Sequence, residues 1–514
     1  MTATERFLPF SLTKPGWAFV LLLFPGLWLL RMLTAWLSGA SLFVDEAQYW
    51  DWSRDLAWGY YSKPPVLPVL IKLSATVGGD SPVGVRWLVQ ALWGLIPLIV
   101  WRLGFEMQRD THPQQSAHAT GAWAAALVSA TLVFGILGQV ATTDGPLLFC
   151  WALSMWLMWR ALQRPELWLR WTFSGLVLAL GVLSKYTMAA VLLSWAVLLL
   201  RRPQMRVFKG MLLAGLVAAV CWLPHLAWNH ANGWPTLKHT ADLLTGAAAS
   251  PAETLGVWVW RSLEYIAGQL LIAGPVVVWM AWRARLQLQP LPTHTALGPP
   301  SPLALAWHFT WPLWLVGAWQ AVQGNAQVNW PAPAWIGACL VLACLLAARP
   351  QAWRWSGPAW VVVSSSVLCS VIGLGGDWRV RFGLPPLAEP WSLWARAQGW
   401  DDALQAMQPD IEMHPKATLV ALDRTVIAHA AYAWRAKGWH TQSWQRTPFP
   451  DHHYDLTKRF TPDRNNPAHD QVLLVLQGAP PAFVHQHYAK STRLEPLGTV
   501  AKNLQIWLLE QPKP

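Results

Sequence analysis

Long apolar segments alternate with short polar ones over the first three-quarters of the chain. A membrane-spanning helix needs about 20 predominantly apolar residues, within a range of roughly 17–25. Segments that approach or reach this length lie at residues 17–40, 84–104, 119–140, 145–162, 168–184, 186–200, 207–227, 256–281, 303–323, 331–347 and 356–374. The pattern predicts a polytopic α-helical membrane protein with about 11 transmembrane helices, and up to 13.

The pattern changes after about residue 375. Short apolar runs at 417–422 and 471–476 alternate there with helical stretches such as 425–437. Half of the 26 acidic residues also lie in the last 139 positions, so this part has an ordinary density of charge. We therefore predict a transmembrane domain over residues 1–375, with a loop at 41–83, and a small soluble α/β domain over residues 376–514.

Composition supports a membrane protein. Of the 514 residues, 54% are apolar and only 12% are charged, whereas soluble chains carry roughly 25% charged residues. This excludes a cytosolic enzyme, a secreted disulfide scaffold and a disordered protein. The 40 tryptophans fit membrane interfaces, and the five cysteines all lie in apolar runs and read as core residues. No nucleic-acid-binding motif accompanies the net charge of +12, so we expect no nucleic-acid partner.

The basic residues orient the predicted helices. They gather in alternate loops, at Arg6, Lys14, Arg109, Arg160, Arg164, Arg170, Arg201, Arg202, Arg206, Lys209, Arg283, Arg285, Arg349 and Arg354. The positive-inside rule places these loops in the cytoplasm. Residues 41–83, 141–144, 228–255 and the C-terminal domain then lie on the opposite side. We expect a multi-pass protein of a bacterial inner membrane, with its C-terminal domain in the periplasm.

The 41–83 loop holds the most informative cluster of polar residues. Four carboxylates fall between residues 45 and 55, interleaved with Trp and Tyr. If this stretch is helical, Asp45, Tyr49 and Trp52 share one face. The aromatic residues would then lie in the membrane interface while the acids face a cavity. The alternative is a solvated loop in which Asp45 caps a helix.

Two more polar residues interrupt apolar segments on the same predicted side. Asp144 lies between two apolar spans, where it lines a cavity or caps the following helix. Lys185 separates two apolar runs, and its ammonium group reaches an anion or extends to the interface. Together with Asp45 and Lys63, these residues suit sugar transfer from a lipid-linked phosphate. An acid can take the proton of an attacking hydroxyl, and cations can hold the leaving phosphate.

Several motifs occur in one order along almost the whole chain. They are Asp45-Glu46-Ala47-x-Tyr49-Trp50, Gly59-Tyr60-Tyr61-Ser62-Lys63-Pro64-Pro65, Thr143-Asp144-Gly145-Pro146, Leu183-Ser184-Lys185, Trp228-Asn229-His230-x-Asn232-Gly233-Trp234, Asn329-Trp330-Pro331, Asp423-Arg424 and His453-Tyr454-Asp455-Leu456. In this set and order the chain resembles the GT-C superfamily glycosyltransferases of the glycosyltransferase family 39 type. That group contains protein O-mannosyltransferases and the aminoarabinose transferases that act on lipid A.

The resemblance implies a role for each matching residue. Asp45 is expected to be the catalytic acid–base residue, and Asp144 a second catalytic acidic residue that lines the cavity. Lys63 is expected to contact the lipid phosphate, with Lys185 assisting. Substrate binding is expected of Glu46, Tyr49 and Tyr61, which lie in the same motifs. Ser62 stands where the aminoarabinose transferases have an acidic residue, which weakens that specific assignment and leaves the general one intact.

Other polar residues give weaker signals. Arg261 begins an apolar span, where it pairs with Glu264 or contacts the phosphate; we include it among the substrate-binding candidates. His452 and His453 are expected to lie on the surface of the C-terminal domain.

Metal binding is the least supported expectation. His225, His230 and His239 flank one loop and, with Glu253 or Glu264, could bind zinc, but their spacing fits no compact metal motif. They are more simply polar loop residues. We assign no metal ligand and no cofactor, and leave open whether a divalent metal assists.

The sequence thus predicts an inverting glycosyltransferase. Its donor is expected to be a polyprenyl-phosphate-linked hexose or pentose, and its acceptor a lipid, a glycan or a protein. The alternative is a transporter or flippase of a lipid-linked substrate. A transporter is expected to show two repeated halves with broken helices, whereas this chain is expected to have a soluble outer domain and carries its acids clustered at one membrane face.

Overall fold

The computed structural model of the protein describes residues 15–109, 114–201, 203–245, 255–285, 301–324, 326–347, 356–374, 394–495 and 501–513. The chain forms two compact units. The first contains Met1–Ala35, Arg86–Ala231 and Thr240–Leu374. The second contains Trp36–Val85, Asn232–His239 and Gly375–Pro514, so the predicted C-terminal domain belongs to the same unit as the 41–83 loop.

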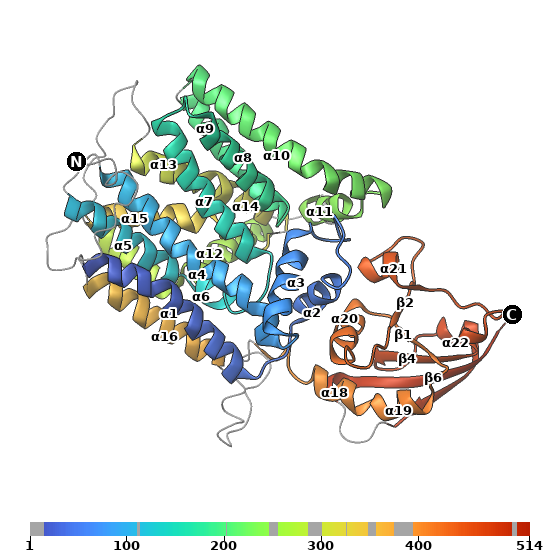
Figure 1. The fold of residues 1–514 in the computed structure, drawn as a ribbon. Coiled ribbons are helices and arrows are strands. Elements are labelled where there is room, and N and C mark those ends of the chain that lie inside the picture. Colours follow the sequence, from blue (N-terminus) through green and yellow to red (C-terminus); the bar gives the residue numbers. More distant parts are fainter. Residues whose placement is uncertain are drawn as a thin grey trace. The chain divides into compact units, whose positions relative to one another are not determined.

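The first unit is built from helices (Figure 1). They are α1 (Pro15–Ser38), α4 (Pro82–Arg109), α5 (Gln114–Ala130), α6 (Leu132–Leu137), α7 (Asp144–Gln163), α8 (Trp168–Val182), η2 (Tyr186–Ala190), α9 (Val191–Arg201), α10 (Met205–Ala231), α12 (Leu255–Arg285), α13 (Pro302–His308), α14 (Trp311–Val322), α15 (Ala334–Ala347) and α16 (Ser356–Leu374), with the ends of α1 and α4 reaching into the second unit. Each predicted apolar segment coincides with one helix or with two consecutive ones. The helical structure predicted for these apolar segments is therefore observed.

Four of the described helices are long and apolar enough to cross a membrane by themselves. They are Pro82–Arg109, Asp144–Gln163, Met205–Ala231 and Leu255–Ala284. Shorter apolar helices account for other predicted spans. Helix α12 is broken at Gly274, which has a φ of 80° and is followed by Pro275. The total of 11 membrane crossings therefore remains a prediction.

Glycines allow the close packing of α8 against α10. The indole of Trp171 lies over Gly210, where a Cβ atom would come within 2.2 Å of the ring. A Cβ atom on Gly175 of α8 would lie 2.5 Å from the carbonyl oxygen of Ala214 on α10. Small residues of this kind let the backbones of membrane helices approach each other.

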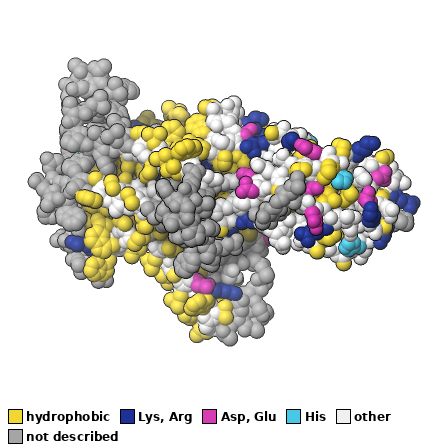
Figure 2. All heavy atoms as spheres, turned by 90° about the horizontal axis from the view of Figure 1, so that it is seen from below, with side chains coloured by type: hydrophobic (Ala, Val, Ile, Leu, Met, Phe, Trp, Pro, Cys, Tyr) yellow, Lys and Arg dark blue, Asp and Glu magenta, His cyan; other side chains and the backbone are white. Residues whose placement is uncertain are grey.

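Large apolar side chains remain exposed on the first unit. Leu200 is 82% exposed and Trp360 is 70% exposed. On the face drawn in Figure 2, hydrophobic side chains gather over the helical part, while acidic, basic and histidine side chains are scattered over the C-terminal part. This distribution suits a helical unit surrounded by lipid, because lipid tails solvate apolar side chains as readily as a protein core does.

The second unit combines helices with one sheet. The loop contributes α2 (Val44–Trp52) and α3 (Val66–Gly78), and α11 (Pro235–Thr245) begins in this unit. The C-terminal elements are α18 (Trp400–Ala406), α19 (Gln408–Met413), β1 (Thr418–Ala421), α20 (Arg424–Ala433), β2 (Gln442–Trp444), α21 (His453–Thr457), β3 (Arg459–Phe460), η5 (Pro467–His469), β4 (Gln471–Gln477), α22 (Val484–His487), β5 (Tyr488–Leu494), η6 (Ala501–Asn503) and β6 (Leu504–Pro512). The expected α/β composition of the C-terminal domain is confirmed.

The sheet has the strand order β3-β2-β1-β4-β6-β5. The first four strands are parallel, and β6 is antiparallel to both β4 and β5. Val420 pairs with Leu474 across β1 and β4, and both are completely buried. The predicted apolar runs at 417–422 and 471–476 are thus the two central strands of this core.

The sheet has a topological switch point beside β1. The chain leaves β1 through α20 to reach β2 on one side, whereas β4 lies on the other side. Ligand-binding residues of open α/β sheets gather at the carboxyl ends of the strands at such a point. Asp423 caps α20 there by accepting a hydrogen bond from the Thr425 N–H at 2.7 Å, so Arg424 begins the helix directly after β1.

Candidate active site

Helix α2 carries the predicted acid–base residue. The helix begins after Phe43, and the buried Glu46 side chain accepts a hydrogen bond from the Phe43 backbone N–H at 3.0 Å. Glu46, and not Asp45, therefore fixes the start of α2. The aromatic ring of Tyr49 is buried against Trp52 on the same helix, at 5.3 Å between ring centroids.

Asp45 is held by a residue of the C-terminal domain. The Arg424 Nη1 atom donates to Asp45 Oδ1 at 2.9 Å and to Gln48 Oε1 at 2.8 Å. We call Asp45, Gln48 and Arg424 the Asp45 cluster. Burial disfavours the charged guanidinium, but the neighbouring Asp45 carboxylate outweighs this and raises the pKa of Arg424. The Asp45 side chain is still 53% exposed, so its carboxylate is accessible as well as oriented.

A second acid of α2 is bound in a similar way. Lys458 Nζ lies 2.8 Å from Asp51 Oδ2 and 3.1 Å from Oδ1. The rings of Trp50 and Tyr432 also meet edge to face at 5.2 Å between centroids, and they join α2 to α20. Cations and aromatic side chains of the C-terminal domain therefore hold α2 along its length.

Lys63 ends a tight turn, residues 60–63, which we call the Lys63 turn. The Tyr60 N–H donates to the Lys63 carbonyl oxygen at 3.1 Å and closes the turn. The Tyr60 ring is buried and stacks on Trp52 at 4.5 Å between centroids, with the planes parallel to within 1°. Thr236 Oγ1 donates to the Tyr60 carbonyl at 2.6 Å. The turn is thus fixed by α2 and by the start of α11.

The C-terminal domain also contacts the Lys63 turn. The Tyr61 N–H donates to His453 Nδ1 at 3.4 Å, and the His453 ring meets Trp52 and Tyr60 edge to face. His453 is only 7% exposed, so the expectation that it lies on the surface is wrong. The imidazole is covered because the 41–83 loop packs on this part of the C-terminal domain. Burial, with Lys458 nearby, lowers the pKa of His453 to about 3 and keeps its ring neutral near pH 7.

Asp144 forms a second cluster, within the first unit. It is the first residue of α7, after Thr143, and its side chain is 5% exposed. Lys185 Nζ donates to Asp144 Oδ1 at 2.8 Å, and Asn329 Nδ2 donates to Oδ2 at 3.1 Å. We call Asp144, Lys185 and Asn329 the Asp144 cluster. Asp144 does lie in the first turn, where the helix dipole favours a carboxylate, but both of its oxygens also bind side chains.

Local backbone features build the Asp144 cluster. A Cβ atom on Gly145 would lie 2.8 Å from the indole nitrogen of Trp93, so glycine lets α7 begin directly against α4. Lys185 is extended, at φ −158° and ψ 131°, between the end of α8 and η2. This break directs its ammonium group to Asp144. The alternative in which Lys185 extends to the interface is therefore not the arrangement observed.

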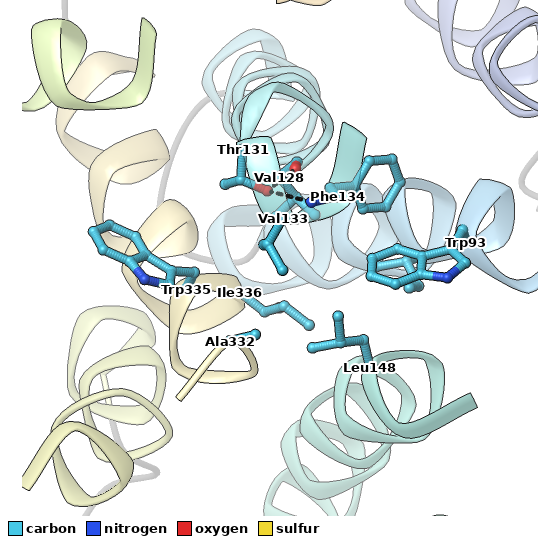
Figure 3. A pocket seen from close by; sticks show the side chains of 10 residues that line it. Trp93, Val128, Thr131, Val133, Phe134, Leu148, Ala332, Trp335 and Ile336 are labelled. Atoms are coloured by element: carbon cyan, nitrogen blue, oxygen red, sulfur yellow. Dashed lines mark hydrogen bonds between the residues drawn. The ribbon is translucent and has the colours of Figure 1, made fainter. Parts of the chain in front are cut away.

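An apolar pocket is lined by side chains of α4, α5, α6, α7 and α15, with Thr131 and Ala332 (Figure 3). Leu148 is four residues beyond Asp144 on α7, and Ala332 is three residues beyond Asn329. The lining residues are Trp93, Ile96, Val128, Thr131, Val133, Phe134, Leu148, Ala332, Trp335 and Ile336. Thr131 uses its hydroxyl to cap α6 by accepting the Phe134 N–H. The remaining lining is apolar, and the cavity is about 10 Å³, so it is a small packing void among these helices.

Arg261 lies elsewhere in the first unit. Its Nη1 atom donates to the Val322 carbonyl at 3.3 Å, at the end of α14. A Cβ atom on Gly324 would come within 2.9 Å of the guanidinium carbon, so the arginine packs closely over this glycine. Glu264 is exposed on α12.

Within the described parts of the chain, no three His, Cys, Asp or Glu side chains are arranged to hold a metal ion. His225 is buried and hydrogen-bonds to Tyr186 and Asn229, and the ring of His239 lies beside Tyr61. Glu253 lies outside the described residues. The structure therefore assigns other contacts to two of the three histidines considered as zinc ligands.

The structure brings the candidate residues together in two groups. Asp144 and Lys185 meet in the first unit, whereas Asp45, Glu46, Tyr49, Tyr61 and Lys63 belong to the second. Arg424, Gln48 and Asn329 were not expected to contact the acids. Arg424 and Asn329 occur in recognisable motifs, but a contact between positions 379 residues apart leaves no mark in a single sequence.

Comparison with known proteins supports the resemblance seen in the motifs. Residues 62–228 match the model of the dolichyl-phosphate-mannose-protein mannosyltransferase family. This segment includes Lys63, Asp144 and Lys185. The chain is also 28% identical over 328 residues to the lipid A galacturonosyltransferase RgtD of Rhizobium johnstonii, which covers 63% of this chain and 65% of that relative. The match thus spans just under two-thirds of the relative's length.

The fold resembles that of ArnT from Cupriavidus metallidurans. The crystal structure bound to undecaprenyl phosphate has a TM-score of 0.59 at 12% identity, over 96% of this chain and 99% of ArnT. The apo structure gives a TM-score of 0.57 at 12% identity, over 97% and 100%. The protein is therefore a membrane protein with an ArnT-like GT-C fold, and the resemblance to GT-C glycosyltransferases seen in its motifs is confirmed.

Proposed function

We propose that the protein is an inverting glycosyltransferase that moves a sugar from a polyprenyl-phosphate donor to a lipid, glycan or protein acceptor. It acts at the periplasmic face of a bacterial inner membrane. The observation that carries the proposal is the Asp45 cluster, in which a half-exposed carboxylate is held by Arg424 and Gln48. The match to a family of lipid-phosphate-dependent mannosyltransferases supports it.

In this reaction a hydroxyl oxygen of the acceptor attacks the anomeric carbon of the donor sugar. The bond from that carbon to the phosphate oxygen breaks as the new glycosidic bond forms on the opposite face, which inverts the configuration. Asp45 takes the hydroxyl proton as a general base. The phosphate leaves with the bonding electron pair, and the Lys63 ammonium stabilises its charge.

The remaining candidate residues support binding. In the Asp144 cluster a carboxylate, an ammonium group and an amide meet at the start of α7, which suits the recognition of a polar part of the donor or acceptor. Tyr61 adjoins Lys63 in the same turn. We assign Glu46, Tyr49, Tyr61, Lys185 and Arg261 to substrate binding or to the support of groups that bind it.

The first substrates to test follow from the relatives. RgtD is a lipid A galacturonosyltransferase, and ArnT has been crystallised with undecaprenyl phosphate. The assay therefore combines purified protein with galacturonic acid linked to undecaprenyl phosphate, and with lipid A. Mass spectrometry of envelope lipids and glycoproteins from cells with and without the gene identifies the sugar and acceptor if this pair does not react.

The test variant is Asp45→Asn, which keeps the shape of the side chain but cannot accept a proton. On a hydroxyl acceptor, turnover should fall by about 10²–10⁴-fold. The matched control is Asp55→Asn, a change of the same kind at an exposed position of the same loop, and it should retain normal turnover. Near-normal turnover of Asp45→Asn on a hydroxyl acceptor would refute the role of Asp45 as base.

A further inference from the structure

We propose that the C-terminal domain takes part in donor recognition through His453, a positioning residue that holds the Lys63 turn. This inference rests on the proposed function, in which Lys63 binds the donor phosphate. It goes further, because it makes a residue almost 400 positions away necessary for the placement of that lysine.

The first step of the argument is the direct contact. His453 Nδ1 accepts a hydrogen bond from the Tyr61 N–H, and Tyr61 is two residues before Lys63. The imidazole also packs edge to face on Tyr60 and Trp52, at 5.3 Å and 4.9 Å between ring centroids. A single buried ring therefore contacts both the backbone of the turn and the aromatic pair beneath it.

The second step is the ionisation state of the ring. A histidine can accept a hydrogen bond at Nδ1 only when it is neutral, with its proton on Nε2. Burial, followed by the charges of Lys458 and His452, lowers the pKa of His453 to about 3. The ring is thus a permanent acceptor at the pH of a periplasm or of an assay near pH 7.

The third step connects the contact to Lys63. The Tyr60 N–H closes the turn on the Lys63 carbonyl, and Pro64 and Pro65 follow at once. Proline fixes φ near −65°, so the backbone beyond Lys63 has little freedom to absorb a shift. A displacement of the Tyr61 backbone is therefore passed on to Lys63. Misplacement of a binding group by about 1 Å can reduce activity by two orders of magnitude.

The test compares His453→Phe with His453→Asn. Phenylalanine retains a ring in the buried space but has no acceptor, whereas the asparagine carbonyl can occupy the position of Nδ1. The probe is undecaprenyl phosphate, whose dissociation constant is measured on the full-length protein in detergent. Its affinity should fall about tenfold in His453→Phe, because a displaced Lys63 weakens its charge-assisted hydrogen bond to the phosphate. The affinity should recover to within about threefold of wild type in His453→Asn.

Kinetics provide a second readout that a general loss of structure would not produce. With the donor and acceptor identified above, His453→Phe should raise the donor KM about tenfold and change kcat by less than threefold, because Arg424 still holds Asp45. His487→Phe, at an exposed histidine of the same domain, is the matched control and should leave both constants unchanged. If His453→Phe does not yield folded protein, His453→Leu replaces it, since leucine also fills much of the space and has no hydrogen-bond acceptor.

The outcomes separate the two proposals. Normal undecaprenyl phosphate affinity in Lys63→Ala would overturn the phosphate role of Lys63 in the proposed function. Reduced affinity in Lys63→Ala with normal affinity in His453→Phe would overturn the positioning role of His453 alone. Two other results would also overturn the positioning role of His453. One is an equal loss of undecaprenyl phosphate affinity in His453→Phe and His453→Asn. The other is a full loss of affinity on adding His453→Phe to a protein that already carries Lys63→Ala.

Discussion

Removal of one partner from the Asp144 cluster is predicted to destabilise the protein strongly. The side chains of Lys185 and Asp144 are 12% and 5% exposed, and their charged atoms lie 2.8 Å apart. Breaking a buried ion pair by removing one partner typically costs about 3–5 kcal/mol, because the other charge stays buried without compensation. Lys185→Met leaves the Asp144 carboxylate with the Asn329 amide, so we expect a loss at the lower end of this range, roughly 3 kcal/mol.

The assay is a double-mutant cycle on unfolding in detergent. Asp144→Asn removes the negative charge, and the double variant Asp144→Asn/Lys185→Met removes both charges. The double variant should be more stable than the sum of the single losses indicates, by about 1–3 kcal/mol.

An exposed ion pair provides the control for this cycle. The side chains of Lys437 and Glu412 are 43% and 53% exposed, and their charged atoms lie 2.7 Å apart. The same cycle applied to this pair should give an interaction of less than about 1 kcal/mol. Additive losses at Asp144 and Lys185 would refute the reasoning, because two charges in direct contact cannot contribute independently.

Three further predictions concern packing, pH and topology. Gly210→Ala should destabilise the protein by about 1–3 kcal/mol in the same unfolding assay, because the new Cβ atom would clash with Trp171. The control is Gly215→Ala in the same helix, where a Cβ atom meets nothing within 4 Å, and it should be neutral or slightly stabilising. Burial lowers the pKa of His429 to about 3, whereas the value in an unfolded chain is about 6.5. As the pH falls, the unfolded state therefore takes up a proton before the folded state does. The protein loses stability as the pH falls from about 6.5 towards 3. His429 thus contributes about 2 kcal/mol to the difference in unfolding free energy between pH 7.5 and pH 5. His429→Phe should therefore reduce the difference in melting temperature between these two pH values. A reporter enzyme fused after residue 375 should be active only in a form that requires export, and cytoplasmic activity would contradict the proposed orientation.

The sequence alone predicted most of the helices and the two central strands of the sheet. Each apolar segment became a helix or a pair of helices because an apolar stretch in lipid must satisfy its own backbone hydrogen bonds, and a helix does so locally. The strands at 418–421 and 471–477 were likewise visible as short apolar runs. Features that depend on neighbouring residues, such as the helical form of residues 44–52, could be predicted in the same way.

The contacts of the candidate site were decided by tertiary structure. The sequence indicated that Asp45, Asp144, Lys63 and Lys185 are polar residues in unusual places, but not which of them are paired. Asp144 binds Lys185 across 41 positions, whereas Asp45 binds Arg424 across 379. These pairings depend on how helices and strands pack in three dimensions, and a single sequence carries no record of that packing.

His453 shows the same limit most clearly. A histidine in a polar stretch of a soluble domain is ordinarily exposed, and nothing beside it in the sequence predicts burial. It is buried because Trp52 and Tyr60, from a loop near the start of the chain, pack against it. The sequence by itself determined which segments become helices and strands, since that choice depends on local pattern and solvent. Only the tertiary structure decided which distant side chains meet, since burial and ion pairing arise from contacts between segments far apart along the chain.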